Sequence, residues 1–367
     1  MLSSCASNAP QDTTKPGGPI STSIQDLANP VFYIAIGIGI FVYGLILFAS
    51  FKYRRRNDDD IPKQVHGNTA MEIGWTVAPA ALLAVFGFLS VGKIFDIAEE
   101  PKDAYEIAVI GHQWWWEYRY PAPGETKLDA KIDRLVNEGK GLEARLETKG
   151  AVVVNANELH IPAGRNIRLQ IHSGDVLHNY WVPKLSGKIY AIPGKINKLT
   201  LKAYEKDGVD GAPKFIYGQC AEFCGTSHAN MRLKVVVNSA NDFDAWLANQ
   251  SGPPVTDTAL SAQAAEGKKL FAGSAGCTAC HIADNSSKTN YQVVDPKTHA
   301  ITGRIGPNLT HFGSRKHFAG AIAEASVTNL KAWLRNPQAF KPGARMVIRK
   351  LNEDEVNKLV AYLKALK

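Results

Sequence analysis

Two long apolar runs stand out in the first hundred residues of the chain. Residues 31–51 and 73–92 contain 21 and 20 consecutive residues without a charged side chain. Each run is long enough to cross the ~30 Å hydrocarbon core of a bilayer as a helix. The segment 52–68 between them opens with "KYRRR", and short loops rich in Lys and Arg tend to stay in the cytoplasm. We therefore expect a transmembrane helical hairpin over residues 25–98, with both ends outside the cytoplasm.

The pattern changes after the second run. From Tyr105 onward, short alternating and β-branched runs such as "AVVVNANELHIPAG" and "MRLKVVVN" are broken by Gly, Pro and Asn, which predicts an antiparallel sandwich or barrel over residues 99–248. The segment 249–261, "NQSGPPVTDTALS", has the composition of a linker. Helical spacing in "AQAAEGKKLFAG", "VTNLKAWLRN" and "NEDEVNKLVAYLKALK" then predicts a small all-α domain over residues 262–367.

Composition and charge narrow the function classes. A hydrophobic content of 45% excludes wholesale disorder. The net charge of +8 is uneven, because residues 261–367 carry 16 Lys and Arg against 7 Asp and Glu. This basic surface suits an acidic docking partner, although simple solvation is the more common explanation. The chain has no basic run interleaved with aromatics, so we expect no nucleic-acid partner.

The cysteines fall into one single residue and two close pairs. Five is an odd number, which argues against a pure disulfide framework. The N-terminal segment 1–24 holds Cys5, and "MLSSC" resembles a bacterial lipobox with Cys5 as the acylated residue. The charged and apolar regions of a signal peptide do not precede it, so either the chain begins downstream of its natural start or the match is a coincidence. Cys5 is thus a candidate lipidation site.

The pair in "CTACH", Cys277 to His281, forms a C-x-x-C-H motif. Two thiols on one turn can bind the vinyl groups of a haem, and the adjacent histidine can then bind the iron. A thioredoxin-like pair would need a βαβ setting, and a zinc knuckle would need more cysteines nearby. Met346 is the only methionine of this region and the candidate for the sixth ligand. His311 and His317 are rivals, although packing or surface roles are more usual for both.

The whole C-terminal region resembles class I cytochrome c. The segment "EGKKLF" matches the first helix of that family, "IGPNL" its proline-containing loop and "ARM" its methionine loop. The resemblance implies covalent haem c bound by Cys277, Cys280, His281 and Met346. It also implies that the carbonyl of Pro307 orients His281.

The other pair lies in "CAEFCGTSHANM", Cys220 to Met231. A zinc site with two Cys and two His would leave the methionine surplus, whereas thiolate, thioether and imidazole together favour copper. A single blue copper needs one cysteine, so Cys220 and Cys224 together can bridge two copper ions. Each copper then needs its own histidine. His228 lies within the motif, and His178 in "SGDVLHNYWVP" is the candidate for the second.

The pattern C-x-E-x-C-G-x-x-H-x-x-M, preceded by "DVLH", resembles the dinuclear CuA site of cytochrome c oxidase subunit II. The hairpin, "GHQWWWEYRY" and "AIPGKIN" match that family too, so the resemblance covers about residues 25–248. With residues 262–367 attached, the chain resembles the bacterial variant in which a cytochrome c domain is fused to subunit II. The implied fold has three parts: a two-helix transmembrane hairpin, an all-β cupredoxin-like Greek-key sandwich or barrel, and a small all-α cytochrome c domain.

The resemblance also implies roles for individual residues. Cys220 and Cys224 would bridge the coppers, with His178 and His228 as terminal ligands, Met231 as a weak ligand and the Glu222 carbonyl as another. The Glu222 side chain would bind a magnesium or manganese ion shared with subunit I. Trp114 matches the tryptophan through which electrons reach CuA, and Glu72 the glutamate at the mouth of a proton pathway. Trp115 and Trp116 are better explained as core or interface aromatics.

The sequence departs from the family pattern near these residues. Asn179 and Tyr180 replace the serine and phenylalanine that usually follow the ligand histidine. Tyr190 stands where an acid often precedes "AIPG", and Lys195 stands where "PGR" is usual. None of the four is a metal ligand, so the departures concern polar contacts at the interface with subunit I.

The function implied is an electron relay in a respiratory haem–copper oxidase. Electrons would pass from cytochrome c or another donor through haem c and CuA to subunit I, where oxygen is reduced to water with proton pumping. Other oxidase subunits and the membrane are the further expected partners. The expected location is the bacterial inner membrane, as a multi-pass protein with the copper and haem domains on the periplasmic side.

Three alternatives compete with the relay. A quinol oxidase subunit II lacks the copper ligands and the haem, and nitrous oxide reductase has a propeller and no membrane hairpin. A copper-delivery protein or a structural zinc protein is a different class, which the fused haem motif disfavours. An optical and EPR spectrum would discriminate among them, because a dicopper signal beside a c-type haem band is expected only for the relay.

Overall fold

The computed structural model describes residues 9–57, 61, 64–136, 142–149, 151–252, 257–283, 293–294, 301–302 and 305–367. Cys5 therefore lies outside the described residues. The contacts divide the chain into two compact units. One unit is Thr22–Glu99, and the other joins Met1–Ser21 to Glu100–Lys367.

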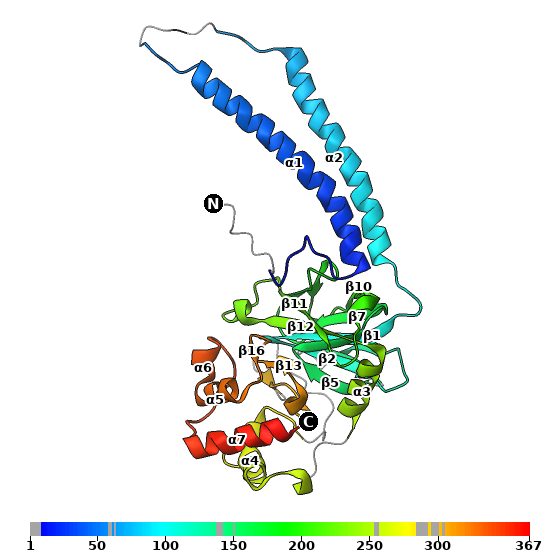
Figure 1. The fold of residues 1–367 in the computed structure, drawn as a ribbon, viewed down its shortest axis with the longest axis vertical. Coiled ribbons are helices and arrows are strands. Elements are labelled where there is room, and N and C mark those ends of the chain that lie inside the picture. Colours follow the sequence, from blue (N-terminus) through cyan, green and yellow to red (C-terminus); the bar gives the residue numbers. More distant parts are fainter. Residues whose placement is uncertain are drawn as a thin grey trace. The chain divides into compact units, whose positions relative to one another are not determined.

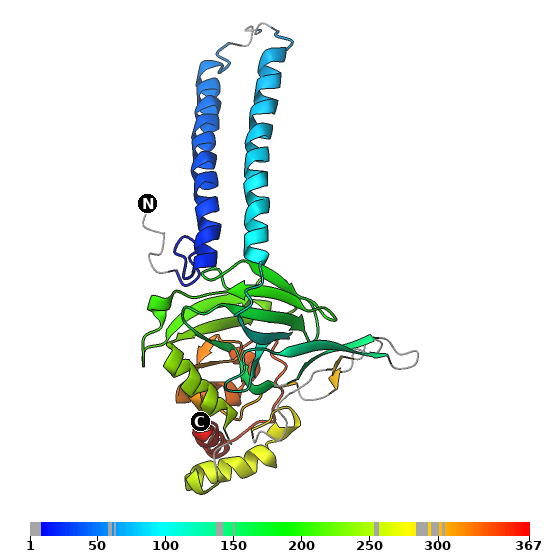
Figure 2. The ribbon, with the colours of Figure 1, turned by 90° about the vertical axis from the view of Figure 1, so that its right-hand side faces the viewer.

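The first unit is a pair of long helices, α1 (Pro19–Lys52) and α2 (Thr69–Ala98), which lie side by side in both views (Figures 1 and 2). Both apolar runs of the sequence lie inside these helices, as predicted. By length and composition each helix can cross a membrane, with mean hydropathies of 2.5 and 1.9 over their most apolar windows. Large apolar side chains such as Phe41 and Phe88 are exposed along them, which suits a lipid environment.

The β domain, residues 100–252, contains two five-stranded sheets among its described residues. The strand order is β10-β7-β1-β2-β5 in the first sheet, whose strands are labelled in Figure 1, and β6-β12-β11-β8-β9 in the second. The first sheet consists of β1 (Tyr105–His112), β2 (Trp115–Pro121), β5 (Ala151–Ala156), β7 (Ile167–Ser173) and β10 (Asn197–Leu201). The second consists of β6 (Glu158–Pro162), β8 (His178–Trp181), β9 (Lys188–Ala191), β11 (Lys214–Cys220) and β12 (Arg232–Asn238). A separate hairpin is formed by β3 (Asp129–Val136) and β4 (Leu142–Lys149).

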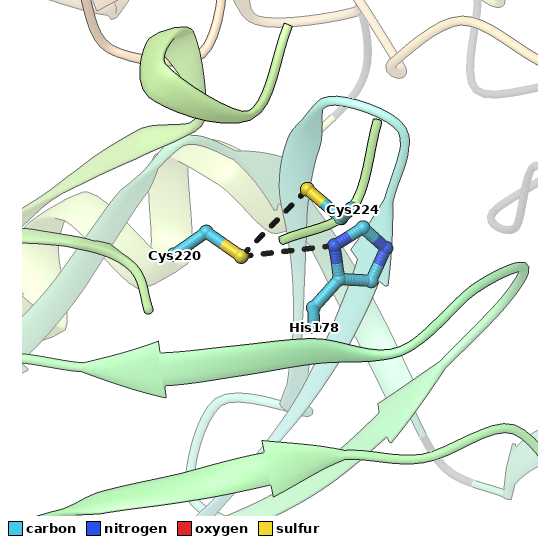
Figure 3. Close-up of side chains that lie close together, drawn as sticks. All are labelled: His178, Cys220 and Cys224. Atoms are coloured by element: carbon cyan, nitrogen blue, oxygen red, sulfur yellow. Dashed lines mark hydrogen bonds between the residues drawn. The ribbon is translucent and has the colours of Figure 1, made fainter. Parts of the chain in front are cut away.

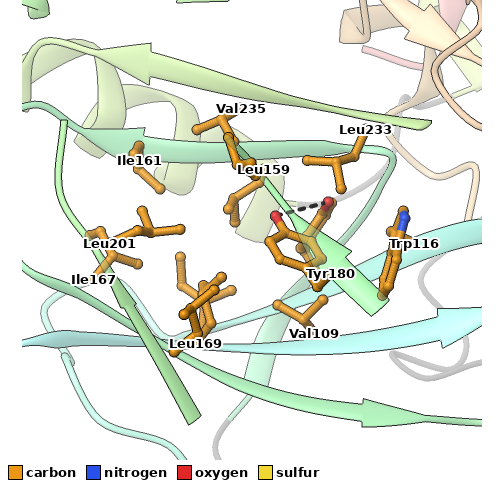
Figure 4. Packing of buried hydrophobic residues seen from close by; sticks show 14 of the residues in the cluster. Val109, Trp116, Leu159, Ile161, Ile167, Leu169, Tyr180, Leu201, Leu233 and Val235 are labelled. Atoms are coloured by element: carbon orange, nitrogen blue, oxygen red, sulfur yellow. Dashed lines mark hydrogen bonds between the residues drawn. The ribbon is translucent and has the colours of Figure 1, made fainter. Parts of the chain in front are cut away.

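The predicted sandwich is confirmed, but it is not wholly antiparallel. The pairs β1–β7 and β6–β12 are parallel. In each case the chain forms other strands between the two partners, which gives it the long connection that a parallel pair needs. The two sheets share one core (Figure 4). Val109 and Leu169 contribute to it from the first sheet, and Leu159 and Leu233 from the second, all fully buried. Burying each such side chain stabilises the fold by roughly 1.5–3 kcal/mol, which makes this core a rigid support for the loops at its ends.

The C-terminal domain, residues 257–367, contains the three predicted helices. They are α4 (Ala262–Ala272), α5 (Val327–Arg335) and α7 (Glu353–Ala365), and the short α6 (Pro337–Phe340) follows α5. Ser261, Ser326 and Asn352 cap the N-termini of the three longer helices with their side chains. The backbones of α4 and α7 meet at Gly267, where a Cβ atom would lie 2.0 Å from the carbonyl oxygen of Lys358.

Two features of this half of the chain were not predicted. Helix α3 (Ala240–Ser251) continues into the first residues of the expected linker, because Ser239 caps it and Phe243 and Leu247 bury one face. The C-terminal domain also contains two-residue strands, β13 (Val293–Val294) with β14 (Ile301–Thr302) and β15 (His317–Phe318) with β16 (Ala323–Glu324). They are too short to leave an alternating pattern in the sequence.

Glu158 on β6 links the β domain to the C-terminal domain. Its carboxylate, in a side chain that is 1% exposed, accepts hydrogen bonds from Nδ1 of His317 at 2.8 Å and from the backbone N–H of Lys316 at 3.0 Å. Nearby, the N–H of Arg232 donates to the carbonyl of Gly320 at 2.9 Å. Within this unit, specific polar contacts therefore hold the two domains together. Glu158 and its partner Lys316 are 158 residues apart in the sequence.

Acid is expected to weaken this link. Burial raises the pKa of Glu158, but the adjacent imidazoles of His160 and His317 outweigh it and lower the pKa to about 2. Because the folded-state pKa lies below the unfolded value near 4.5, the stabilisation is complete above about pH 4.5 and is lost as the pH falls toward 2. A shift of this size corresponds to roughly 3 kcal/mol. Denaturant unfolding of the full chain at pH 6 and pH 3 measures it.

Glu158→Gln supplies the comparison, because other carboxylates also titrate in this range. The stability difference between wild type and Glu158→Gln is expected to shrink between pH 6 and pH 3. Glu205→Gln, at an exposed glutamate of the same domain, is the matched control. A difference between wild type and Glu158→Gln that is independent of pH would contradict the role assigned to Glu158.

Candidate metal and cofactor sites

Sheet pairing brings together the cysteines and the distant histidine of the copper motif. His178 opens β8, Cys220 closes β11, and the two strands pair antiparallel with Cys220 opposite Tyr180. The chain then turns through residues 221–231 at the end of the second sheet before β12 begins. A histidine about forty residues upstream therefore faces the cysteine loop.

The two thiols lie side by side and are not joined. Their Sγ atoms are 3.9 Å apart (Figure 3), which is far beyond the ~2.05 Å of a disulfide. Nδ1 of His178 lies 3.8 Å from Sγ of Cys220, and Nδ1 of His228 lies 3.5 Å from Sγ of Cys224. The ligand atoms of His178, Cys220 and Cys224 all lie within 4.8 Å of one another. One imidazole thus adjoins each thiol, as a site with two bridging thiolates requires.

Two weaker candidate ligands complete the group. Sδ of Met231 lies 3.8 Å from Sγ of Cys224, and Met231 is fully buried. The carbonyl oxygen of Glu222 lies 3.3 Å from Sγ of Cys220. The six residues predicted from the sequence therefore lie around one point. This set of soft sulfur and imidazole donors suits copper better than zinc.

Asp175 orients His178, and the sequence interpretation did not assign it this role. Its carboxylate lies 2.8 Å from Nε2 of His178 and also accepts the N–H of Gln113 at 2.7 Å. With Nε2 occupied, Nδ1 is the nitrogen left for a metal. Burial opposes protonation of His178, but Asp175 and Cys220 raise its pKa to about 8. The aspartate is part of the quoted "DVLH", and its spacing of three residues from the histidine was the available signal.

The ionisation of each thiol affects that of the other, and the surroundings favour ionisation of Cys220 before Cys224. The hydrogen bond from Cys224 lowers the pKa of Cys220, and His178 and two backbone groups act in the same direction. A thiolate is the form of cysteine that binds metals. These contacts therefore favour the thiolate form of Cys220.

Glu222 has a neighbour at one of the positions where the sequence departs from the family that it resembles. The exposed Tyr190 forms a hydrogen bond with the Glu222 side chain, which raises the pKa of Tyr190. Asn179 is buried and its carbonyl accepts the N–H of Ala221 at 2.9 Å, while Lys195 pairs with Ile192 in an isolated bridge. The departures at Asn179 and Tyr190 thus lie directly against the loop that holds the candidate ligands.

Trp114 lies against this loop. Its indole Nε1 donates to the carbonyl oxygen of Cys224 at 3.0 Å, and the amide of Gln113 donates to the same oxygen at 2.6 Å. Of the two tryptophans expected to be packing residues, Trp116 is fully buried in the core. Trp115 stacks on His112 with ring centroids 4.3 Å apart.

The haem motif lines a cavity in the C-terminal domain. Cys277, Cys280, His281 and Met346 all contribute to its wall. Nδ1 of His281 lies 2.9 Å from the carbonyl oxygen of Pro307, so the ring presents Nε2 as its free nitrogen. Gly306 packs on that ring so closely that a Cβ there would lie 2.3 Å from it. A mostly apolar pocket with two adjacent thiols and a fixed imidazole fits a covalently attached haem.

The rival histidines are placed elsewhere. Neither His311 nor His317 contributes to the cavity wall as described. His317 is engaged by Glu158, and His311 is buried. Met346 is the predicted distal ligand that the structure places at the cavity.

Comparison with known proteins agrees with this geometry. Residues 105–240 match the periplasmic domain of cytochrome c oxidase subunit II, residues 8–92 match its transmembrane domain, and residues 264–367 match cytochrome c. Cytochrome c oxidase subunit 2 of Alkalihalophilus pseudofirmus is 31% identical over 100% of this chain and 94% of its own length. The chain belongs to the cytochrome c oxidase subunit II family.

Other members of the subunit II family show a similar degree of likeness. Cytochrome c oxidase subunit 2 of Bacillus subtilis is 30% identical over 97% of this chain and 91% of its own length. One solved structure that matches is the crystal structure of the periplasmic domain of subunit II of cytochrome oxidase from Bradyrhizobium japonicum. The match covers 41% of this chain and 95% of the Bradyrhizobium chain, at 30% identity and a TM-score of 0.29.

The family confirms the predicted class and architecture of this subunit II. A helical pair that belongs to a membrane protein precedes a β-sheet cupredoxin-like domain, and a cytochrome c domain follows. These domains imply copper and haem as the cofactors. Glu72 lies in the first turn of α2, just after the capping Asn68.

Proposed function

We propose that this subunit II relays electrons from cytochrome c or another donor, through its own haem c and a dinuclear copper centre, to subunit I of a respiratory haem–copper oxidase. The observation that carries the proposal is the pair of unlinked thiols, Cys220 and Cys224, with an imidazole beside each and a buried thioether against the second. On this proposal oxygen reduction to water and proton pumping take place on subunit I.

The copper ligands are proposed to be Cys220 and Cys224 as bridges, His178 and His228 as terminal ligands, and Met231 and the Glu222 carbonyl as weak ligands. Bound there, the copper pair supplies one-electron transfer with the charge shared between two ions. The chain's own contribution is rigidity. The core beneath β8 and β11 and the Asp175–His178 contact keep the donor atoms in place.

The haem ligands are proposed to be the thiols of Cys277 and Cys280, which form the covalent links, with His281 and Met346 on the iron. Pro307 fixes the orientation of His281 through its carbonyl group. A distal thioether raises the reduction potential of a haem relative to a second imidazole, which favours acceptance of an electron from an outside donor.

Trp114 is proposed to connect the two sites. It contributes to the wall of the haem cavity and also donates a hydrogen bond to the carbonyl of the copper-loop residue Cys224. One buried aromatic side chain therefore touches both. This is the residue that the family resemblance assigns to electron transfer into the copper site.

Further roles follow from the same proposal. The Glu222 side chain is assigned to a magnesium or manganese ion shared with subunit I, Glu72 to the mouth of a proton pathway, and Cys5 to lipidation. The bacterial inner membrane is the proposed location, with residues 99–367 on the periplasmic side. The remaining subunits of the oxidase are the proposed partners.

Spectroscopy of the purified full chain in detergent tests the relay. We expect a c-type haem band together with the EPR spectrum of one unpaired electron shared by two copper nuclei. Two equivalents of copper per chain and no zinc are expected from metal analysis. A zinc-containing, EPR-silent site would refute the relay and favour a structural metal protein, and haem without any copper would do the same for the copper assignment.

A further inference from the structure

The segment from Lys341 to Met346 contacts both the haem cavity and the copper loop. Met346, at its end, is at the haem cavity. Lys341 and Arg345 contact the β domain at Gln113 and Trp114, and Gly343 lies against the copper loop. No other described segment of the C-terminal domain combines a proposed haem ligand with contacts to the copper loop, so we call residues 341–346 the junction loop.

Lys341 makes the most buried of these contacts. Its side chain is 4% exposed, and Nζ donates to the carbonyl oxygen of Trp114 at 2.6 Å and to that of Ala319 at 3.1 Å. Burying an amine without such partners would be costly. Burial lowers the pKa of Lys341 to about 7, and both the ammonium and the neutral amine keep N–H groups for the two carbonyls.

Arg345 holds the residue before Trp114. Its guanidinium donates to the side-chain carbonyl of Gln113, and Cζ lies 5.8 Å from the centre of the Trp114 ring. The other end of the Gln113 amide donates to the carbonyl of Cys224. A continuous chain of contacts thus runs from Arg345 through Gln113 to the copper loop.

Two glycines allow the backbones to approach this closely. A Cβ on Gly343 would lie 2.4 Å from Oγ1 of Thr226 in the copper loop, and φ at Gly343 is +82°. A Cβ on Gly320 would lie 2.5 Å from Nζ of Lys341 and 3.0 Å from the carbonyl oxygen of Trp114. Since these positions have no room for a side chain, the close approach depends on glycine at both of them.

We propose that Lys341 and Arg345 are positioning residues that lock the junction loop onto Gln113 and Trp114 and thereby set the rate of electron transfer between the haem and copper sites. This inference rests on the proposed function and extends it to residues outside the ligand sets. In the step concerned, one electron leaves ferrous haem, which becomes ferric, and reduces the copper pair by one electron. No bond forms or breaks, and no proton is required.

The test compares Lys341→Met and Arg345→Gln with wild type in the full chain. Lys350→Met, at an exposed lysine of the same domain, is the matched control for loss of a positive charge. Hydrogen–deuterium exchange over residues 113–116 measures the contact itself. Flash reduction of the haem, followed by the absorbance of copper, measures the transfer.

We expect both variants to increase exchange over residues 113–116 and to slow transfer by about tenfold, with haem and copper spectra like those of wild type. Arg345→Lys should recover part of the transfer rate, because it keeps a donor near Gln113. Exchange equal to that of Lys350→Met would overturn the proposal, and so would increased exchange with an unchanged transfer rate.

A second substitution covers variants that fail to bind haem. Gln113→Ala removes the acceptor of Arg345 from the β-domain side and should increase exchange over residues 341–346. Unchanged exchange there would overturn the proposal. Failure of the proposed function is distinguishable, because it would show as absence of haem-to-copper transfer in wild type, whereas the exchange measurements report the contact in either case.

Discussion

Replacing Cys224 with serine is expected to abolish the dicopper EPR spectrum of the full chain. Sγ of Cys224 adjoins three other candidate donors, on Cys220, His228 and Met231. A serine hydroxyl is harder and does not ionise near neutral pH, so it cannot replace a bridging thiolate. What remains is at most a mononuclear site around Cys220 and His178. Oxygen consumption by the assembled oxidase should fall by more than the roughly 10–100-fold that loss of an outer-shell partner costs.

Cys280→Ser is the matched control for this substitution. It makes the same change at the haem motif, so it should leave the dicopper spectrum intact and remove one thioether link of the haem. The reciprocal result is expected for Cys224→Ser, which should retain the wild-type haem band. Survival of the dicopper spectrum in Cys224→Ser would show that the two thiols do not act as a bridging pair.

Gly306→Ala is expected to disrupt the haem site without touching a ligand. A Cβ at this position would lie 2.3 Å from Cε1, 2.5 Å from Nδ1 and 2.9 Å from Nε2 of the His281 ring. The ring must therefore move, and its contact with the carbonyl of Pro307 at 2.9 Å is lost. Such overpacking costs typically about 1–3 kcal/mol. We expect a lower thermal midpoint for the C-terminal domain and loss of the optical spectrum of a haem with His and Met ligands.

Gly187→Ala is the control for Gly306→Ala, because a Cβ at Gly187 would meet nothing within 4 Å. It should change neither the haem spectrum nor the thermal midpoint. The dicopper spectrum should persist in both variants. A wild-type haem spectrum in Gly306→Ala would mean that His281 is not held where the structure places it.

Local sequence pattern predicted much of the architecture. The two charge-free runs predicted the hairpin, because a bilayer fixes the length of apolar chain needed to cross it. Three helices of the C-terminal domain followed from their spacing. The parallel pairs β1–β7 and β6–β12 were missed, since each joins strands from distant parts of the chain and alternation does not record which neighbour a strand takes.

The candidate sites could likewise be predicted where their residues are close in the sequence and not where they are distant. Cys220, Cys224, His228 and Met231 lie within a dozen residues, so their spacing indicated a metal site, and the thioether of Met231 favoured copper over zinc. His178 was a candidate for the second histidine, but nothing local distinguishes it from a packing histidine, and only the family resemblance made the assignment specific. Asp175 was visible only as three residues before His178, and its contact with Nε2 required the fold.

The contacts between the two domains left no signal in the sequence. Glu158 and Lys341 are ordinary charged residues in ordinary segments, and each becomes informative only once it is seen to be buried against a partner more than 150 residues away. Charge composition had indicated a basic surface on the C-terminal third. It could not show that one of its lysines is enclosed against Trp114, because burial depends on contacts that a local pattern does not contain.

In a relay of the proposed kind, the junction loop would change what limits delivery of an electron to Trp114. A separate donor protein must find and leave this surface in every turnover, at a rate proportional to its concentration. Here the C-terminal domain is joined to the β domain by the short segment between Ser251 and Ala262, and such tethering gives an effective concentration in the millimolar range. For a relay of the proposed kind, the last electron transfer between separate proteins then takes place at the C-terminal domain and not at Trp114. Delivery to Trp114 becomes first order and insensitive to dilution.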